Sequence, residues 1–408
     1  MLNKKAKPVK VKDNVSSARL STEDLSVKEW KDTEELKEAR RRGGIPSRYA
    51  RSGTPELEDV EEKVATLLGL ECNRVAVYNY GMTAVVAALE YWRPRAGLIA
   101  VHGHNEYTRT KQYFSEILVS KGVIPEEVSS YSIEGLSDAI RKYRPQIVFL
   151  ETIGNGPDIP ILDVKRFLSI PGLKDPGLLT VLDNTLAADR IRPEELIEND
   201  LNIIVVESGT KFYTKNRSSV GFAYAKDPRV VERLKLLRTI TGGAPDRIPA
   251  KLLNNDIISP KEFADRNNRI FTNAKILAES CSSVLLRDSA FSVSYPNLAG
   301  HPESEFANKN YPGGAAPLFF LRTKGNINQY ALTDALFSAP VIKAACLNIE
   351  SFGFDFTAIY PNDYTPLDSK GKEPYVRISA GTEDADVVME IGGALRHVLG
   401  IVSGISGG

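Results

Sequence analysis

Lys211 is the residue whose type and setting point most directly to chemistry. It follows the apolar run 203–206, which is typical of a buried strand, so the lysine is expected just beyond a strand end. Ser208 and Thr210 place two hydroxyl groups directly before it, and Asp183 ends an earlier apolar strand candidate in the same way. A lysine amine able to form an imine, a carboxylate and a hydroxyl-lined phosphate site are what pyridoxal phosphate (PLP) requires from a protein. We therefore predict that Lys211 binds this cofactor covalently.

Other parts of a PLP site are also present in the sequence. The turn 80–83 joins a strand candidate to a helix candidate, so its backbone amides, including those of Gly81 and Met82, are expected to bind an anion at the positive helix end. Tyr107 is the aromatic residue best placed to stack on a cofactor ring. Burial and nearby positive charge would lower the pKa of Lys211 and favour its reaction as a nucleophile.

These residues need a scaffold that brings strand ends together, and the chain has a suitable pattern. Strand candidates alternate with helix candidates, which is typical of an α/β domain built on a mostly parallel sheet. Ligands bind such sheets beyond the carboxyl ends of the strands, where Asp183 and Lys211 fall. The predicted strands cover residues 74–78, 97–101, 146–150, 178–182, 203–206 and 220–225, and the predicted helices cover 55–68, 82–92, 108–120 and 133–143.

The second half of the chain changes character. Residues 229–283 are predicted to be helical, and residues 284–400 mix strand candidates with helix candidates. The candidates in this region are strands at 316–321 and 375–378 and helices at 329–339 and 387–399. We expect an N-terminal arm over residues 1–60, a PLP-binding α/β domain over 61–250 and a smaller α+β domain over 251–408.

Composition narrows the class of protein. The 408 residues carry 52 basic and 52 acidic side chains, and the formal net charge of zero argues against nucleic acid or an anionic membrane as the main partner. Cys72, Cys281 and Cys346 form no CxxC pair, so neither a disulfide framework nor a zinc site is expected. His102 and His104 are spaced like metal ligands but have no third ligand nearby, so we expect no metal. A cytoplasmic location is expected.

Several motifs occur in a fixed order along most of the chain. They are Tyr49-Ala50-Arg51, Gly81-Met82, Tyr107, Glu151-Thr152 with Asn155 and Pro157, Asp183-Asn184-Thr185, Ser208-Gly209-Thr210-Lys211, Glu350-Ser351-Phe352-Gly353 and the segment from Arg377 to Asp384. Together they resemble the Cys/Met-metabolism (trans-sulfuration) family of PLP-dependent enzymes, which includes cystathionine γ-synthase, the cystathionine lyases and methionine γ-lyase. The resemblance implies the fold-type-I PLP-dependent transferase fold, with a large mostly parallel seven-stranded sheet and a smaller α+β C-terminal domain.

The resemblance also implies roles for individual residues. Tyr49 and Arg51 would reach the phosphate in a neighbouring subunit, which implies a homodimer or homotetramer with shared active sites. Asn155 would lie near the phenolic oxygen of the cofactor. Ser351 and Arg377 would bind the α-carboxylate of the substrate, a bidentate task that suits a planar guanidinium.

The chain departs from the family pattern at three places. The family's Gly-His-Ser-Asp run after the lysine is here 215–218, so the support of the lysine loop is expected to differ. Arg109 stands where the family has a small residue; it either meets an anionic or polar substrate group or turns outward to a surface carboxylate. Phe356 replaces a glutamate that reads a distal amino group in the γ-lyases, so cystathionine is a less expected substrate unless Asp355 substitutes.

The resemblance predicts a reaction class and leaves one alternative. Lys211 would remove the α-proton of an amino acid, with Tyr107 as acid or base near the leaving group. We expect elimination or replacement at the γ- or β-carbon of a homoserine-, methionine- or cysteine-like substrate, with γ-chemistry favoured. The alternative is a catalytically altered relative that acts as a binding or regulatory protein. The altered segment 215–218 favours this alternative, and the joint retention of Lys211, Asp183, Tyr107, Arg51 and Arg377 opposes it.

Overall fold

The chain divides into two units, Met1–Ile45 and Pro46–Gly408. The computed structural model describes residues 53–128, 131–283, 291–323, 327–364 and 372–405, together with residues 34, 37, 38 and 41 in the first unit. The four described residues of the first unit are helical and form ion pairs at i,i+3 spacing, Lys37 with Glu34 and Arg41 with Glu38. Tyr49 and Arg51, which we predicted to reach a neighbouring subunit, lie outside the described residues.

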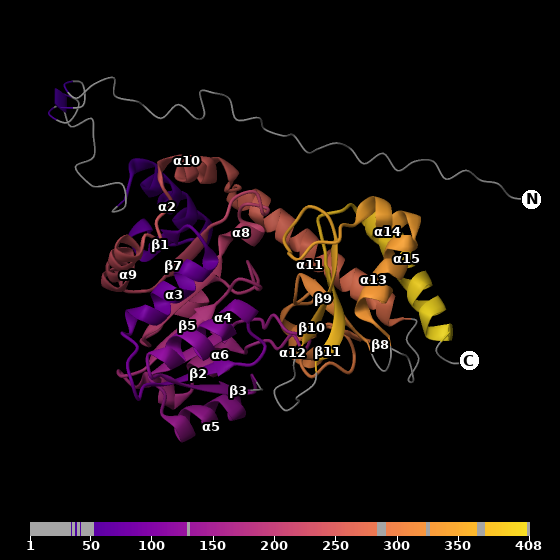
Figure 1. The fold of residues 1–408 in the computed structure, drawn as a ribbon, viewed down its shortest axis with the longest axis horizontal. Coiled ribbons are helices and arrows are strands. Elements are labelled where there is room, and N and C mark those ends of the chain that lie inside the picture. Colours follow the sequence, from indigo (N-terminus) through magenta and orange to yellow (C-terminus); the bar gives the residue numbers. More distant parts are fainter. Residues whose placement is uncertain are drawn as a thin grey trace, which may run out of the picture. The chain divides into compact units, whose positions relative to one another are not determined.

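A seven-stranded sheet organises the first half of the second unit (Figure 1). Its strands lie in the order β1-β7-β6-β5-β4-β2-β3, and β7 is antiparallel to both neighbours while the other pairs are parallel. The strands are β1 (Val75–Tyr78), β2 (Ile99–Gly103), β3 (Ile124–Val128), β4 (Ile147–Glu151), β5 (Leu179–Asp183), β6 (Ile203–Ser208) and β7 (Gly221–Tyr224). The mostly parallel sheet expected from the sequence is therefore confirmed.

Helices cover both faces of this sheet, because alternate strand residues point to opposite sides. Val75 and Val77 belong to one apolar cluster, whereas Ala76 and Tyr78 belong to another. The helices of this half are α2 (Pro55–Leu68), α3 (Gly81–Tyr91), α4 (Thr108–Gln112), α5 (Ile133–Tyr143), α6 (Val164–Leu168), α7 (Pro193–Ile197), α8 (Gly209–Phe212), α9 (Pro228–Thr241) and α10 (Arg247–Asp256). Single turns η2 (Cys72–Arg74) and η4 (Pro171–Lys174) and the π-helical turn η3 (Tyr113–Leu118) complete it.

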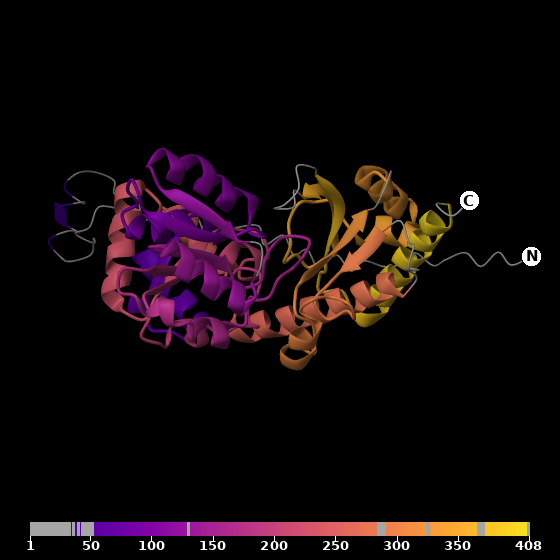
Figure 2. The same ribbon diagram turned by 90° about the horizontal axis from the view of Figure 1, so that it is seen from below.

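A four-stranded antiparallel sheet organises the second half (Figure 2). Its strands lie in the order β10-β11-β9-β8, and α11 and α13 pack against them. The strands are β8 (Phe291–Ser294), β9 (Leu318–Thr323), β10 (Ala358–Tyr364) and β11 (Glu373–Ser379). The helices are α11 (Pro260–Ser282), α12 (Ser304–Asn310), α13 (Gln329–Ser338), α14 (Pro340–Ala345) and α15 (Ala385–Ile405).

The differences from the sequence prediction have physical causes. Strands β3, β8 and β10 were not predicted. The four-residue strand β8 carries two serines, and in β3 and β10 Pro125 with two following glutamates and the run Pro361-Asn362-Asp363 mask the usual strand pattern. Strand β3 forms an edge of the large sheet, where polar residues and proline are tolerated. The helix predicted over 108–120 is present but changes to π-helical geometry within η3. Among the described residues, no helix has both the length and the apolar character needed to cross a membrane.

Candidate active site

A cavity of about 710 Å³ opens at the carboxyl ends of β4, β5 and β6 and receives residues of the small sheet from the other side. Parallel strands end at the same sheet edge, so loops that are distant in sequence meet there. Every predicted site residue in the described part of the chain except Phe356 lines this cavity. These residues are Gly81, Met82, Tyr107, Arg109, Asn155, Asp183, Ser208, Thr210, Lys211, Ser351 and Arg377.

Lys211 lies on the short helix α8 and points across the cavity to the small-sheet half. Its Nζ donates a hydrogen bond of 2.9 Å to Ser351 Oγ and lies 5.3 Å from the centre of the Phe352 ring. Burial, and after it the positive charge of Arg377, lower the pKa of Lys211 from 10.5 to about 8. An amine with this pKa loses its proton far more readily than a surface lysine, as a nucleophile or a base requires.

Asp183 ends β5 beside Glu151, its register partner at the end of β4. Its Oδ1 accepts a hydrogen bond of 2.9 Å from the Thr185 amide, and burial raises its pKa to about 6. No ion pair joins Asp183 to a cation among the described residues. A positively charged ring nitrogen placed here would compensate the buried carboxylate, and would lower its pKa again.

The N-terminus of α3 forms a cradle suited to a phosphate. Its N-cap residue Tyr80 makes no side-chain capping bond, so the first amides of the helix remain available to an anion. A Cβ atom on Gly81 would lie 2.8 Å from Ser208 Cβ, and one on Gly221 would lie 2.2 Å from the Tyr80 carbonyl oxygen. Glycine at both positions therefore permits the close approach of helix, strand and lysine loop. Thr210 Oγ1 accepts from the Val220 amide at 3.0 Å, which fixes the loop wall beside this cradle.

Arg377 brings a buried guanidinium into the same cavity from β11. The side chain is only 9% exposed, and its Nε and Nη2 have no hydrogen-bond partner among the described residues. In the described part of the chain, Asn155 Oδ1 is likewise buried without a hydrogen-bond partner. Buried polar groups are almost always paired in folded proteins, so unpaired groups on residues that line a cavity indicate a polar ligand. The donors, acceptors and amine of this cavity fit PLP together with an amino-acid carboxylate.

Comparison with known proteins agrees with this geometry. A family model described as Cys/Met metabolism PLP-dependent enzyme matches residues 22–395. The chain belongs to this family of PLP-dependent enzymes. Among curated relatives, cystathionine β-lyase of Neurospora crassa is 24% identical over 360 residues, which cover 87% of this chain and 74% of that protein. L-Methionine γ-lyase of Porphyromonas gingivalis is 29% identical over 264 residues, which cover 64% of this chain and 62% of that protein.

Solved structures show the same fold. The crystal structure of metB from Corynebacterium glutamicum aligns with a TM-score of 0.71 at 24% identity and covers 87% of this chain and 88% of that one. Cystathionine γ-synthase from Xanthomonas oryzae pv. oryzae, in complex with aminoacrylate and cysteine, aligns with a TM-score of 0.68 at 21% identity and the same coverage. The large sheet with a smaller C-terminal sheet, expected from the resemblance, is therefore confirmed as the family fold.

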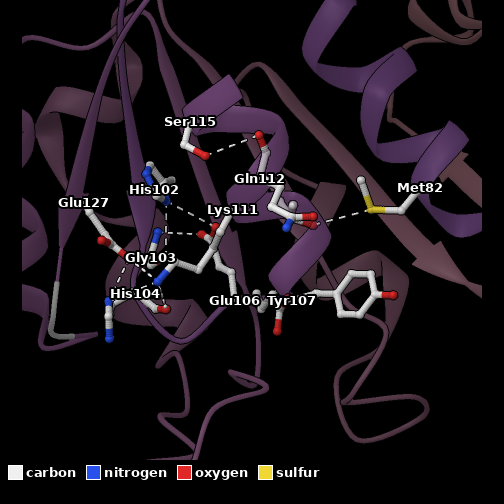
Figure 3. Close-up of polar contacts among 12 residues, drawn as sticks. Met82, His102, Gly103, His104, Glu106, Tyr107, Lys111, Gln112, Ser115 and Glu127 are labelled. Carbon is white, nitrogen blue, oxygen red and sulfur yellow. Dashed lines mark hydrogen bonds and ion pairs between the residues drawn. The ribbon is translucent and has the colours of Figure 1, made fainter. Parts of the chain in front are cut away.

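In this family member, Tyr107 stands at the start of α4 with its ring beside the cavity (Figure 3). Its backbone amide donates to Glu151 Oε1 at 2.6 Å, and the ring side chain is 44% exposed. One turn later, Lys111 Nζ pairs with Glu127 Oε1 at 2.6 Å, and His104 Nδ1 lies 2.7 Å from the same oxygen. This clamp joins α4, which begins directly after Tyr107, to β3.

The two histidines that resembled metal ligands each contact a glutamate close to α4. His102 Nδ1 lies 3.3 Å from Glu106 Oε2, and its ring stacks on Phe114 with centroids 4.4 Å apart. Burial lowers the pKa of His102, but the hydrogen bond and charge of Glu106 outweigh it and raise the pKa overall. His104 shares Glu127 with the clamp described above. Both side chains therefore support the position of α4.

The residues expected to determine substrate choice occupy different environments. Arg109 is exposed at the cavity wall, and its Nη1 donates to Gln112 Oε1 at 2.7 Å; no ion pair joins it to a described carboxylate. Phe356 lies outside the cavity lining and stacks on Phe354 with centroids 4.7 Å apart and an interplanar angle of 13°. Asp355 is engaged by Arg266, with Nη2 2.8 Å from Oδ1, so it faces that cation rather than the cavity.

Several cavity residues were not identified as binding residues from the sequence. Glu350, Asn362 and Asp363 line the cavity from the small-sheet half, and Asp363 also accepts from Gln329 Nε2 at 2.8 Å. Glu350 directly precedes Ser351, and this adjacency was the signal that could have identified it. Asn362 and Asp363 lie on β10, a strand that was not predicted, so the sequence carried no comparable signal for them.

Proposed function

We propose that this enzyme catalyses PLP-dependent elimination or replacement at the γ- or β-carbon of a homoserine-, methionine- or cysteine-like amino acid. The observation that carries the proposal is the buried guanidinium of Arg377, whose Nε and Nη2 have no partner among the described residues, in the same cavity as the low-pKa amine of Lys211. A carboxylate bound by the first group would bring the α-carbon of an amino acid to the second.

The chain's own residues then have distinct tasks. Arg377 binds the α-carboxylate through two parallel N–H donors, and Ser351 lies next to the amine that must approach the α-carbon. Lys211 removes the α-proton, and its lowered pKa makes the neutral amine accessible near physiological pH. Tyr107 covers the cavity and serves as acid or base near the leaving group.

PLP, when bound, supplies an electron sink for the carbanion that forms at the α-carbon. Asp183 would pair with its ring nitrogen and keep that nitrogen protonated. The other predicted contacts are Lys211 to the aldehyde carbon, the amides of Gly81 and Met82 with Ser208 and Thr210 to the phosphate, Asn155 to the phenolic oxygen and Tyr107 to the ring face.

Within this reaction class we favour γ-chemistry on a homoserine- or methionine-like substrate. Asp355 is paired with Arg266 and Phe356 lies away from the cavity lining, so neither supports recognition of a distal ammonium group. Arg109 lines the cavity and supports a polar or anionic group at the far end of the substrate.

We further propose a cytoplasmic homodimer or homotetramer in which Tyr49 and Arg51 complete the phosphate site of a neighbouring subunit. Cross-linking or light scattering would give the subunit number. Mixed oligomers of a K211A chain and an R51A chain would test sharing, because only shared sites restore activity in the mixture. Failure to restore activity would contradict the shared-site proposal.

The decisive experiment is spectroscopic and chemical. Purified protein should be yellow, and borohydride should bleach it and leave the cofactor covalently attached to the peptide containing Lys211. The K211A variant should lose that attachment. O-acyl and O-phospho-homoserine, cystathionine, methionine and cysteine are then screened with keto-acid and thiol detection. A protein that takes up PLP at Lys211 but converts none of these substrates would refute the proposed reaction class.

A further inference from the structure

The segment that follows Lys211 is one of the three places where the sequence departs from the expected family pattern, and it has an unusual backbone. Lys215 and Asn216 both adopt left-handed conformations, with φ of 55° and 60°. The Asn216 amide donates to the Thr210 carbonyl at 2.7 Å, which turns the chain back toward the lysine. Lys215 pairs with Glu262, so the turn is also tied to α11. Asparagine tolerates this conformation better than most residues, so the turn itself is compatible with its sequence.

The side chain of Asn216 makes two hydrogen bonds whose directions can be assigned. Its Nδ2 donates to the Phe352 carbonyl oxygen at 2.8 Å. A carbonyl oxygen only accepts, so the amide orientation is fixed and Oδ1 faces Ser351. Ser351 Oγ lies 2.9 Å from that oxygen and must therefore donate to it. The lone pairs of the Ser351 hydroxyl are consequently left for Lys211 Nζ, 2.9 Å away.

The partner segment is held against Lys211 independently of this amide. Gly353 has a φ of 78°, and a Cβ atom there would lie 2.4 Å from the Lys211 carbonyl oxygen, so the two backbones are in close contact. Arg266 Nη2 donates to the Gly353 carbonyl at 3.3 Å and holds the segment from the other side. Backbone packing thus fixes the position of Ser351, and Asn216 fixes the direction of its hydroxyl proton.

We propose that Asn216 is a positioning residue that orients the Ser351 hydroxyl as a permanent hydrogen-bond acceptor for the Lys211 amine. Asn216 does not line the cavity and touches neither reacting atom, so it acts through Ser351. The role deepens the proposed function, because the amine it serves is the proposed base. It also assigns a role to the segment 215–218, which would then support the active site.

The test follows the titration of Lys211 in the full-length protein without cofactor. Lys211 is labelled with an amine-specific reagent across a pH series, and its modification is quantified by mass spectrometry. An oriented acceptor favours the ammonium form, so N216G should lower the pKa of Lys211 by about half a unit, a roughly threefold rise in the neutral fraction. Glycine is chosen because it accepts the left-handed backbone without strain. R217A, an exposed neighbour on the same turn, is the matched control and should change nothing.

A double-mutant cycle with S351A distinguishes positioning from a general loss of structure. S351A should shift Lys211 in the same direction as N216G, and adding N216G to S351A should give no further shift. Additive shifts, an unchanged titration in N216G, or an equal shift in R217A would overturn the proposal.

A second variant keeps the test decisive if N216G does not fold. N216D keeps an acceptor toward Ser351, loses the donor to the Phe352 carbonyl and adds a negative charge two hydrogen bonds from the amine, so the pKa of Lys211 should rise by about one unit. No rise would overturn the proposal. The labelling needs neither bound PLP nor turnover, so a protein that shows these shifts but converts no substrate would refute the proposed function and leave the positioning role standing.

Discussion

Replacing Arg377 with methionine should make the protein more stable and much less active. The guanidinium is buried, and its Nε and Nη2 lack partners among the described residues, so the folded protein bears the desolvation penalty of two unpaired donors. Each such donor costs about 1–3 kcal/mol, and methionine retains most of the apolar stem, so R377M should raise the free energy of unfolding by about 1–3 kcal/mol. Urea unfolding of the full-length protein measures this change.

R377M should also lower turnover, and its effect should depend on whether the ligand carries an α-carboxylate. Loss of a buried charged partner typically costs about 2–5 kcal/mol, so kcat/KM for an amino-acid substrate should fall by about 30-fold or more. Binding of the corresponding amine without a carboxylate, measured by the change in cofactor absorbance, should be nearly unaffected. The pKa of Lys211 should rise, because the Arg377 charge is the second cause, after burial, of its depression from 10.5 to about 8.

Arg266 provides the matched control for R377M. It is also a buried arginine, but its guanidinium is paired with Asp355 and the Gly353 carbonyl. R266M should therefore destabilise the protein by about 1–3 kcal/mol. This cost is smaller than that of breaking a fully buried ion pair, because the Asp355 side chain is half exposed. If R377M also loses stability, or weakens binding of both ligands equally, the assignment of Arg377 to an incoming carboxylate is wrong.

Three further predictions concern charge. R109A should raise KM for a substrate with an anionic far end much more than for a neutral substrate. The reason is that the Arg109 guanidinium lines the cavity and is held only by Gln112 among the described residues. Equal effects on the KM of both substrates would contradict this role. D183N should weaken PLP binding about 10-fold or more, because it removes the charge that pairs with the ring nitrogen. The PLP affinity of the wild-type protein should fall as the pH drops through about 6, where Asp183 takes up a proton, and the affinity of D183N should not change there. Titrations of cofactor fluorescence at several pH values check both. Burial raises the pKa of Glu207 from 4.5 to about 7, so the folded state binds this proton more tightly than the unfolded state and its contribution to stability is lost as pH rises toward and through 7. In E207Q, the free energy of unfolding should fall less between pH 5 and 8 than in the wild-type protein, by up to about 3 kcal/mol. If E207Q keeps the wild-type pH dependence, Glu207 is not its source.

The strand-end residues could be predicted from sequence because their position follows from simple rules. Asp183 and Lys211 each follow an apolar run, and parallel strands place such residues at one edge of the sheet. The motifs also identified Arg377, although its burial without partners depends on the packing of the small sheet and left no trace in the sequence. Apolar periodicity likewise could not reveal β10, whose proline, asparagine and aspartate look like a turn.

Contacts between the large-sheet half and the small-sheet half could not be predicted from the sequence. The hydrogen bond from Ser351 to Asn216 joins residues 135 positions apart and depends on a left-handed backbone and one rotamer. The motif comparison indicated only that support of the lysine loop would differ. For Phe356, the position in the motif suggested a substrate contact, whereas the structure stacks the ring on Phe354 outside the cavity lining. A side chain's direction at such a position is set by its neighbours in space.

The contact between Lys211 and Ser351 spans 140 positions of the chain, and this separation has a consequence for protein synthesis. Chains emerge from the ribosome N-terminus first, so all seven strands of the large sheet are available well before Ser351 and Arg377 are made. During that interval Lys211 lacks its contact with Ser351 and the charge of Arg377, which is the second cause of its lowered pKa. The full lowering of this pKa therefore requires the C-terminal sheet, and an incomplete chain carries a less acidic ammonium group at this position.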